Sequence, residues 1–201
     1  MNAIGMLVQQ LETVNVRFHH VASAVTPQLM TASAGPKSNP VGFLMWHMAR
    51  SQDWGVHTAI RNVPEVVRSA PWSTMPGLST PGIGTGFAPG EASELAGRLH
   101  LPDLLRYADA VNAAAIGWVR TLDERDLDSI PDVSAHDAPF AEYQTPGFQA
   151  EMDSGPEHDE AVGKSGGQPV WLYLTSVCVT HLHRHLGEVD LTLGILTGRA
   201  G

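Results

Sequence analysis

Cysteine is almost absent from this chain of 201 residues, since Cys178 is the only one. No disulfide can form within the chain, and its cysteine usage does not point to an oxidising compartment. Basic residues are also scarce: 12 Lys and Arg stand against 21 Asp and Glu, with a formal net charge of −9. An acidic surface repels phosphate backbones, so we expect no nucleic-acid partner.

Long apolar runs are missing as well. No stretch has the length and hydrophobicity to span a bilayer, so we expect no membrane partner. Residues 1–10 lack the basic start of a signal peptide and carry glutamines within their apolar pattern, which predicts a cytoplasmic protein. A hydrophobic content of 43% suffices for one globular domain with a sizeable core, spanning residues 1–201.

What the chain does have is helical periodicity. Apolar residues recur at steps of three and four, with Pro27 near the end of the first stretch and Ser38-Asn39-Pro40 as a start signal for the second. We find no convincing strand and no solenoid repeat. The pattern predicts an all-α four-helix bundle. Its long helices are expected at about 4–30, 40–62, 102–122 and 169–196, with a short helix at 91–99.

Two long irregular segments interrupt the predicted helices. Residues 63–90 are rich in proline and glycine, and residues 131–169 are rich in Asp, Glu, Gly and Pro. Long ordered loops in compact domains are often binding loops or lids. The run from Gly82 to Phe87 is loosely similar to a phosphate-binding glycine loop, but no strand precedes it, so we reject that interpretation.

Three histidines lie close together near the C-terminus, at His181, His183 and His185. On a helix, His181 and His185 differ by roughly 40° around the axis and share a face, whereas His183 is rotated by about 200°. A strand would place all three on one face, but the surrounding period of three and four favours a helix. Two imidazoles one turn apart and pointing into a bundle recur in metal sites.

His47 is the third candidate ligand, because it lies in an apolar stretch of the second predicted helix and needs a partner if it is buried. With His181 and His185 it predicts a divalent metal site. Three neutral histidines leave Zn²⁺, Ni²⁺ or Fe²⁺ with open positions for water or substrate, and the ion would lower the pKa of a bound water or thiol. In the alternative, no metal is bound and each imidazole bonds a backbone carbonyl or a neighbouring helix.

One acidic side chain, Glu188, and one thiol, Cys178, lie near the predicted ligand pair in the sequence. Glu188 could orient His185 from behind or pair with Arg184 across one turn. Cys178 is expected to be a small buried hydrophobe, with a role as a fourth, softer ligand as the alternative.

Two further residues of the second predicted helix could border the site. Arg50, one turn from His47, could anchor a substrate carboxylate, or it could form a surface salt bridge. His57 lies about three turns from His47 and could line the mouth of the cavity.

Two segments of this chain resemble motifs of one family. The stretch from Asn39 to Trp54 resembles the second-helix motif of the DinB-like superfamily, and the stretch from His181 to Glu188 resembles its HxxxH segment. The resemblance implies a bundle of up-down-down-up topology with a divalent metal on His47, His181 and His185. It also implies a homodimer, since many members are dimers.

The same resemblance suggests an activity, because related members include mycothiol-dependent maleylpyruvate isomerase and bacillithiol transferases. It implies a metal-dependent enzyme for a small-molecule substrate, a thiol-dependent S-transferase or isomerase with a low-molecular-weight thiol as cofactor. A metal-dependent hydrolase and a non-catalytic metal-binding or stress-response protein are the alternatives.

Overall fold

The computed structural model describes residues 2–132 and 168–198, and within these ranges every regular element is a helix. This confirms the predicted all-α class. The main helices are α1 (Ala3–Ala22), α2 (Val41–Asp53), α3 (Pro89–Arg98), α4 (Leu101–Val119), α6 (Val170–Thr175) and α7 (His181–Thr197). Most of the second predicted loop, 131–169, lies outside the described residues.

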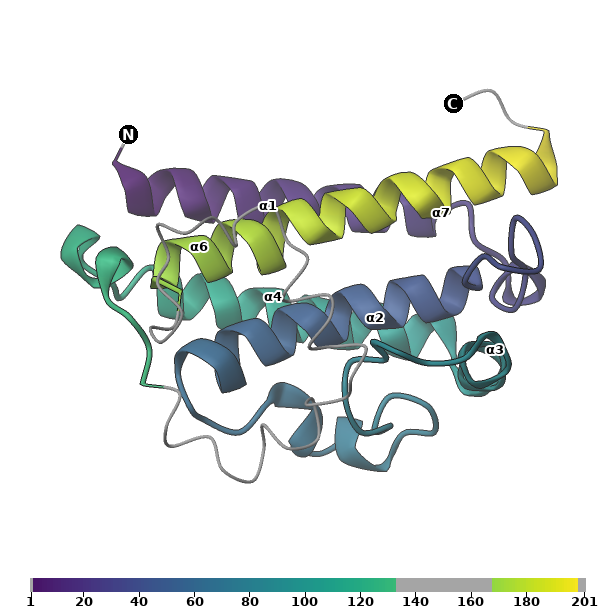
Figure 1. The fold of residues 1–201 in the computed structure, drawn as a ribbon, viewed down its shortest axis with the longest axis horizontal. Helices are drawn as coiled ribbons and strands as arrows, with labels where there is room; N and C mark the ends of the chain where they lie inside the picture. The colour runs from purple at the N-terminus through teal and green to yellow at the C-terminus, as the bar shows by residue number, and fades with distance from the viewer. Residues whose placement is uncertain (1, 133–167, 199–201) are drawn as a thin grey trace.

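The four long helices form a bundle. Helices α1 and α7 run in one direction, whereas α2 and α4 run in the other, which is the up-down-down-up order (Figure 1). Helix α1 packs against α4 and α7, and α2 packs against the same two helices. In the described part of the chain, we find no helix with the length and hydrophobicity that crossing a membrane would need.

Helix α1 is shorter than its apolar pattern predicts. It ends at Ala22, with Ser23 as C-cap, and the chain then forms a short 3₁₀ turn, η1 (Pro27–Leu29). Proline cannot donate a backbone hydrogen bond and clashes with the preceding turn, so Pro27 begins a new element instead of continuing the old one. The predicted extent of 4–30 was therefore too long at its C-terminal end.

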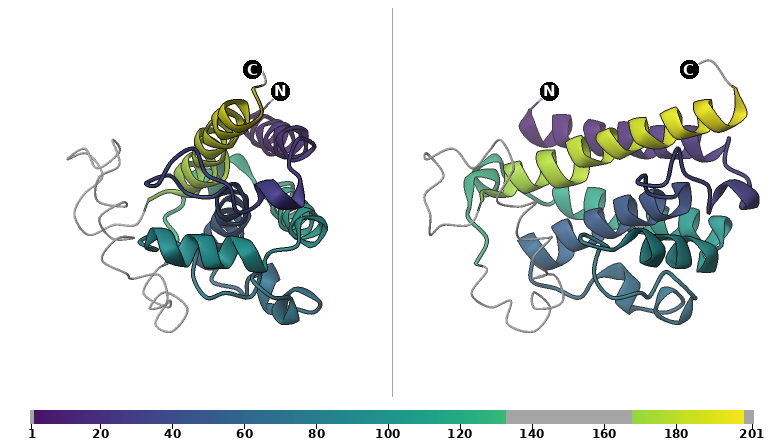
Figure 2. Two further views of the ribbon diagram at one scale, coloured as in Figure 1. Left: turned by 90° about the vertical axis from the view of Figure 1, so that its right-hand side faces the viewer. Right: turned by 45° about the vertical axis from the view of Figure 1, so that its right-hand side comes forward.

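Helix α2 is the central element, and all of its residues are buried. Helices α4 and α7 pack against it on one side. Helix α3 and the irregular chain that precedes it cover the other side (Figure 2). Because no face of α2 meets solvent, each of its polar side chains needs a partner inside the protein.

Wide π-helical turns occur in both helices that carry the candidate ligands. Helix α2 continues into η2 (Trp54–Ile60), and α6 is joined to α7 through η7 (Ser176–Thr180). The two π segments contact each other. Such turns are rare and are found frequently at functional sites, and η7 ends directly before His181.

Candidate metal centre

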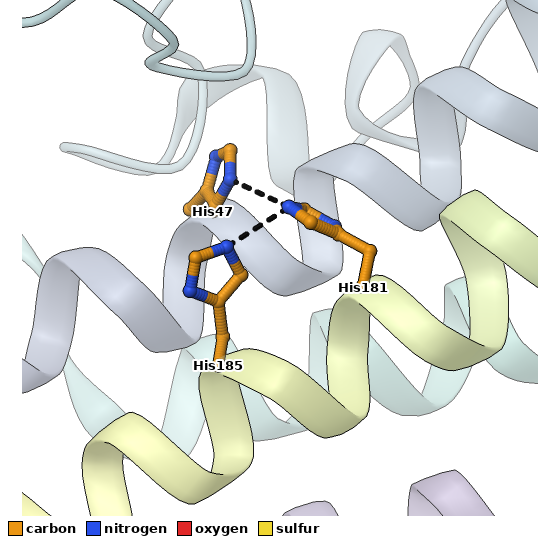
Figure 3. A group of neighbouring side chains, drawn as sticks. All are labelled: His47, His181 and His185. Carbon is orange, nitrogen blue, oxygen red and sulfur yellow. Dashed lines mark hydrogen bonds between the residues drawn. The ribbon is translucent and has the colours of Figure 1, made fainter. Parts of the chain in front are cut away.

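The packing of α2 against α7 brings the three predicted ligands together (Figure 3). His47 comes from α2, and His181 and His185 come from successive turns of α7. The Nε2 atom of His181 lies 3.1 Å from Nε2 of His47 and 2.9 Å from Nε2 of His185. One ligand atom from each ring lies within 4.8 Å of the others, so the three could hold one metal ion.

The spacing of these nitrogens suits a metal ion. Ligand nitrogens about 2.0–2.1 Å from a tetrahedral zinc ion lie roughly 3.3 Å apart. The two separations from Nε2 of His181, 3.1 and 2.9 Å, are a few tenths of an ångström below that value, so a small rotation of the rings would make room. His47 and His185 are each only 6% exposed, which limits competition from solvent.

Acceptors behind two of the rings select the tautomer that a metal site requires. Nδ1 of His47 lies 2.6 Å from the carbonyl oxygen of Ile83. Nδ1 of His185 lies 2.9 Å from Oε2 of Glu188. A carbonyl and a carboxylate can only accept, so each Nδ1 carries the hydrogen and each Nε2 keeps its lone pair for the cluster.

The third ring is held in its neutral form. Burial, together with the neighbouring rings of His47 and His185, holds the pKa of His181 well below its usual value of 6.5. Its Nδ1 atom is buried without a hydrogen-bond partner. A neutral imidazole is the form of histidine that binds metals.

Beside the cluster lies a pocket of about 190 Å³. The ring of Phe43 stacks on that of His47, with centroids 5.9 Å apart and an interplanar angle of 4°. The ring centroid of Phe87 lies 5.9 Å from that of Phe43, so the two phenyl rings form an aromatic wall of the pocket. The described residues that line the pocket are Asn39, Phe43, His47, Gly84, Thr85, Gly86, Phe87, Arg184 and His185.

The glycine run from Gly82 to Phe87 forms one wall of this site. It provides the Ile83 carbonyl that faces His47. Gly84 has a φ of +88°, and a Cβ there would come within 2.8 Å of both Phe43 and Trp46. Glycine at every second position signals positive φ and close backbone approach, and that signal could have indicated this wall of the site.

Arg50 does not reach the pocket. Its side chain is fully buried, its Nη1 lies 2.6 Å from Oε2 of Glu65, and its Nε donates to the carbonyl of Gly82 at 3.2 Å. Both expectations for this residue, a substrate anchor and a surface salt bridge, are therefore corrected. The chain after α2 folds back over this face, which turns a position near the surface of a bare helix into an interior one.

His57 belongs to the same buried network and not to the mouth of the cavity, which corrects that expectation. Its Nδ1 lies 2.8 Å from Oδ1 of Asp53. Asp53 also accepts hydrogen bonds from the hydroxyl of Tyr107 at 2.6 Å and from the backbone of Val66 and Val67 at 2.9 and 3.0 Å. The network ties the irregular segment to α2 and α4.

Burial raises the pKa of Asp53, but the hydrogen bond from His57 and the charge of Arg50 outweigh it, so the pKa lies below 3.8. Burial raises the pKa of Tyr107 well above 10, so its hydroxyl stays protonated and can donate. Asp53 is therefore an ionised, fully engaged anchor for the segment that carries the glycine run.

The structure distinguishes the alternatives for two other candidates. Cys178 is completely buried and is outside the histidine cluster, and burial raises its thiol pKa to about 12, so it is a small buried hydrophobe. Glu188 contacts His185 directly at 2.9 Å, whereas its Oε1 lies 4.0 Å from Nε of Arg184. Its closer partner is thus the histidine.

Comparison with known proteins identifies the family of this chain and a solved structure with a similar fold. The sequence pattern of the DinB superfamily matches residues 10–189. No curated protein matches the chain. The fold is similar to the crystal structure of a conserved protein from Enterococcus faecalis, with a TM-score of 0.71, 18% identity and 99% of each chain covered. At that identity the similarity indicates a shared fold alone.

Proposed function

Because this chain belongs to the DinB superfamily, we propose that it is a divalent-metal-dependent enzyme whose ion is held by His47, His181 and His185. The observation that carries the proposal is the convergence of three Nε2 atoms in one buried place. The Ile83 carbonyl and the Glu188 carboxylate support it, since each holds a ring in the metal-binding tautomer.

Neutral nitrogen ligands suit zinc, nickel or iron, and three of them leave open positions at which such an ion lowers the pKa of a bound thiol or water. Residues around the candidate metal position favour binding of an ion and a ligand there. His181 stays neutral, Phe43 and Phe87 exclude water along one wall, and Gly84 lets the backbone come close.

We propose a thiol-dependent transfer or isomerisation of a small molecule, with a low-molecular-weight thiol as cofactor. The state of Cys178 supports an external thiol, because the only cysteine of the chain is buried and its pKa of about 12 keeps it protonated. The protein itself therefore offers no reactive thiolate, and the sulfur must enter the pocket with a ligand.

An activity assay tests this proposal. Metal-free protein and protein loaded with Zn²⁺, Ni²⁺ or Fe²⁺ would be mixed with low-molecular-weight thiols and the electrophile 1-chloro-2,4-dinitrobenzene. We expect metal-dependent conjugation that is lost in His181→Ala. Turnover of a model ester without thiol would support a hydrolase instead, and no turnover of either substrate would support a non-catalytic metal-binding protein.

Glu188→Ala should weaken zinc binding by about tenfold, because loss of a group that orients a ligand typically costs 10–100-fold in metal affinity. The lower end applies, since Glu188 is half exposed and solvent can partly replace it. Competition with a chromogenic chelator gives the dissociation constant. Asp190→Ala removes the same charge from an exposed position of α7 and serves as the control; equal affinities in the two variants would contradict the proposed role.

We also propose that the chain forms a homodimer. Support comes from Leu191 and Ile195, which lie one turn apart on α7 and are 65% and 58% exposed. Exposed apolar side chains grouped on one helix face are typical of contact surfaces. Light scattering of the purified protein should give twice the mass of one chain, and the mass of a single chain would contradict the proposal.

A further inference from the structure

The pocket beside the histidine cluster has one charged residue among its described lining residues, Arg184. Its side chain is 55% exposed, so the guanidinium can meet a ligand that enters from solvent. Its Nη2 donates to Nε2 of His185 at 3.1 Å, which places the cationic group beside the candidate ligand atoms. The ring nitrogen has one lone pair, so a metal ion bound there would take the place of this hydrogen bond and leave the guanidinium donor for another acceptor. Arg184 therefore marks the boundary between the metal cluster and the open pocket.

We propose that this pocket binds a small organic carboxylate with a flat apolar body, and that Arg184 is the anchor for the carboxylate. The inference rests on the proposed function, because it identifies the substrate class of the same site. A guanidinium presents a planar fork of donors that matches the two oxygens of a carboxylate, and such paired hydrogen bonds are among the strongest in proteins.

The charge distribution favours an anion. The three histidines contribute no negative charge. Glu188 is not among the described lining residues, but its carboxylate faces Nδ1 of His185 and lies 4.0 Å from Nε of Arg184, so it offsets one positive charge. A divalent ion on the cluster and the guanidinium of Arg184 would put two positive centres side by side. An anionic ligand relieves their repulsion, even though the chain as a whole carries a net charge of −9.

The shape and the walls of the pocket define the rest of the ligand. A volume of about 190 Å³ is below the roughly 300–1,000 Å³ of pockets for drug-sized ligands, so it suits a body of about one ring. Phe43 and Phe87 form an aromatic wall against which a flat apolar group can stack. Gly84 and Gly86 also line the pocket and take up none of its space with side chains, and Gly84 packs against Phe43.

Calorimetric titration with benzoate tests the inference, with benzamide as the neutral analogue of the same shape. Wild-type protein, Arg184→Gln and the control Arg120→Gln would be measured with and without bound zinc. Arg120 is also an exposed arginine in an ion pair, with Glu12 at 3.1 Å, but it lies at the end of α4. We expect Arg184→Gln to weaken benzoate binding about ten- to hundredfold and Arg120→Gln to leave it unchanged.

The two proposals fail in different ways. Equal benzoate affinity in wild type and Arg184→Gln, equal affinity of wild type for benzoate and benzamide, or no benzoate binding at all would overturn the carboxylate site. Absence of stoichiometric zinc binding would instead overturn the metal-dependent function. Since the guanidinium is present without zinc, the same variant comparison on metal-free protein still decides whether Arg184 anchors the carboxylate.

Discussion

Replacing His181 with alanine should abolish stoichiometric metal binding, which we expect at about one divalent ion per wild-type chain. Nε2 of His181 lies 3.1 Å from Nε2 of His47 and 2.9 Å from Nε2 of His185, and its loss leaves two ligands on separate helices. We expect the dissociation constant for zinc to rise by roughly a hundredfold or more, and His47→Ala to behave alike. Elemental analysis and chelator competition measure the two quantities.

His183→Ala is the matched control, because it removes an imidazole from the same helix two residues away. That ring is not part of the histidine cluster, and its pKa is lowered by burial and by the charge of Arg17. It should leave metal content unchanged. Circular dichroism of the metal-free variants checks that both are folded, and a full complement of metal in a folded His181→Ala variant would contradict the site.

Arg50→Met should lower the free energy of unfolding of the metal-free protein by about 3–5 kcal/mol. Arg50 and its acidic partners Asp53 and Glu65 are all buried, and the guanidinium donates to Glu65 at 2.6 Å. Without the arginine these carboxylates stay inside the protein without their cation, which is the costly way to break a buried ion pair. Denaturant unfolding monitored by tryptophan fluorescence gives the free energy.

Arg120→Met provides the comparison, since the exposed pair of Arg120 with Glu12 should contribute at most about 1 kcal/mol.

The pH dependence of the free energy of unfolding gives a second test of the buried network. Because folding lowers the pKa of Asp53 from 3.8, the stability that its ionisation provides is complete above that value and is lost as the pH falls through the lower folded pKa. The gap between wild type and Arg50→Met should therefore narrow below about pH 4. Similar losses in the two arginine variants would contradict a buried network.

The buried network also explains how an irregular segment can form a precise wall of the site. Asp53 holds the segment at Val66 and Val67, and Arg50 holds it again at Gly82. The next residue, Ile83, then presents its carbonyl to His47. Residues that the proposed chemistry does not touch thus position a group that orients a candidate ligand.

Much of this arrangement follows from the sequence alone. The period of three and four identified the long helices, because an amphipathic helix repeats its buried face every 3.6 residues whatever it packs against. The same period separated His183 from the pair His181 and His185. The structure also brings this pair together with His47, as predicted. A buried imidazole needs a polar partner inside the bundle, and the inward-facing histidines of a neighbouring helix provide one.

Only the tertiary structure decided what surrounds the cluster. Arg50 was a plausible anchor on a bare helix, but it became an interior residue once a later segment covered α2, and Arg184 lines the pocket in its place. The hydrogen bond between His47 and Ile83 likewise joins segments far apart in the chain. Local periodicity predicts which residues share a face of one helix. Which segment packs against that face depends on contacts between residues far apart in the chain, and these contacts leave no local pattern in the sequence.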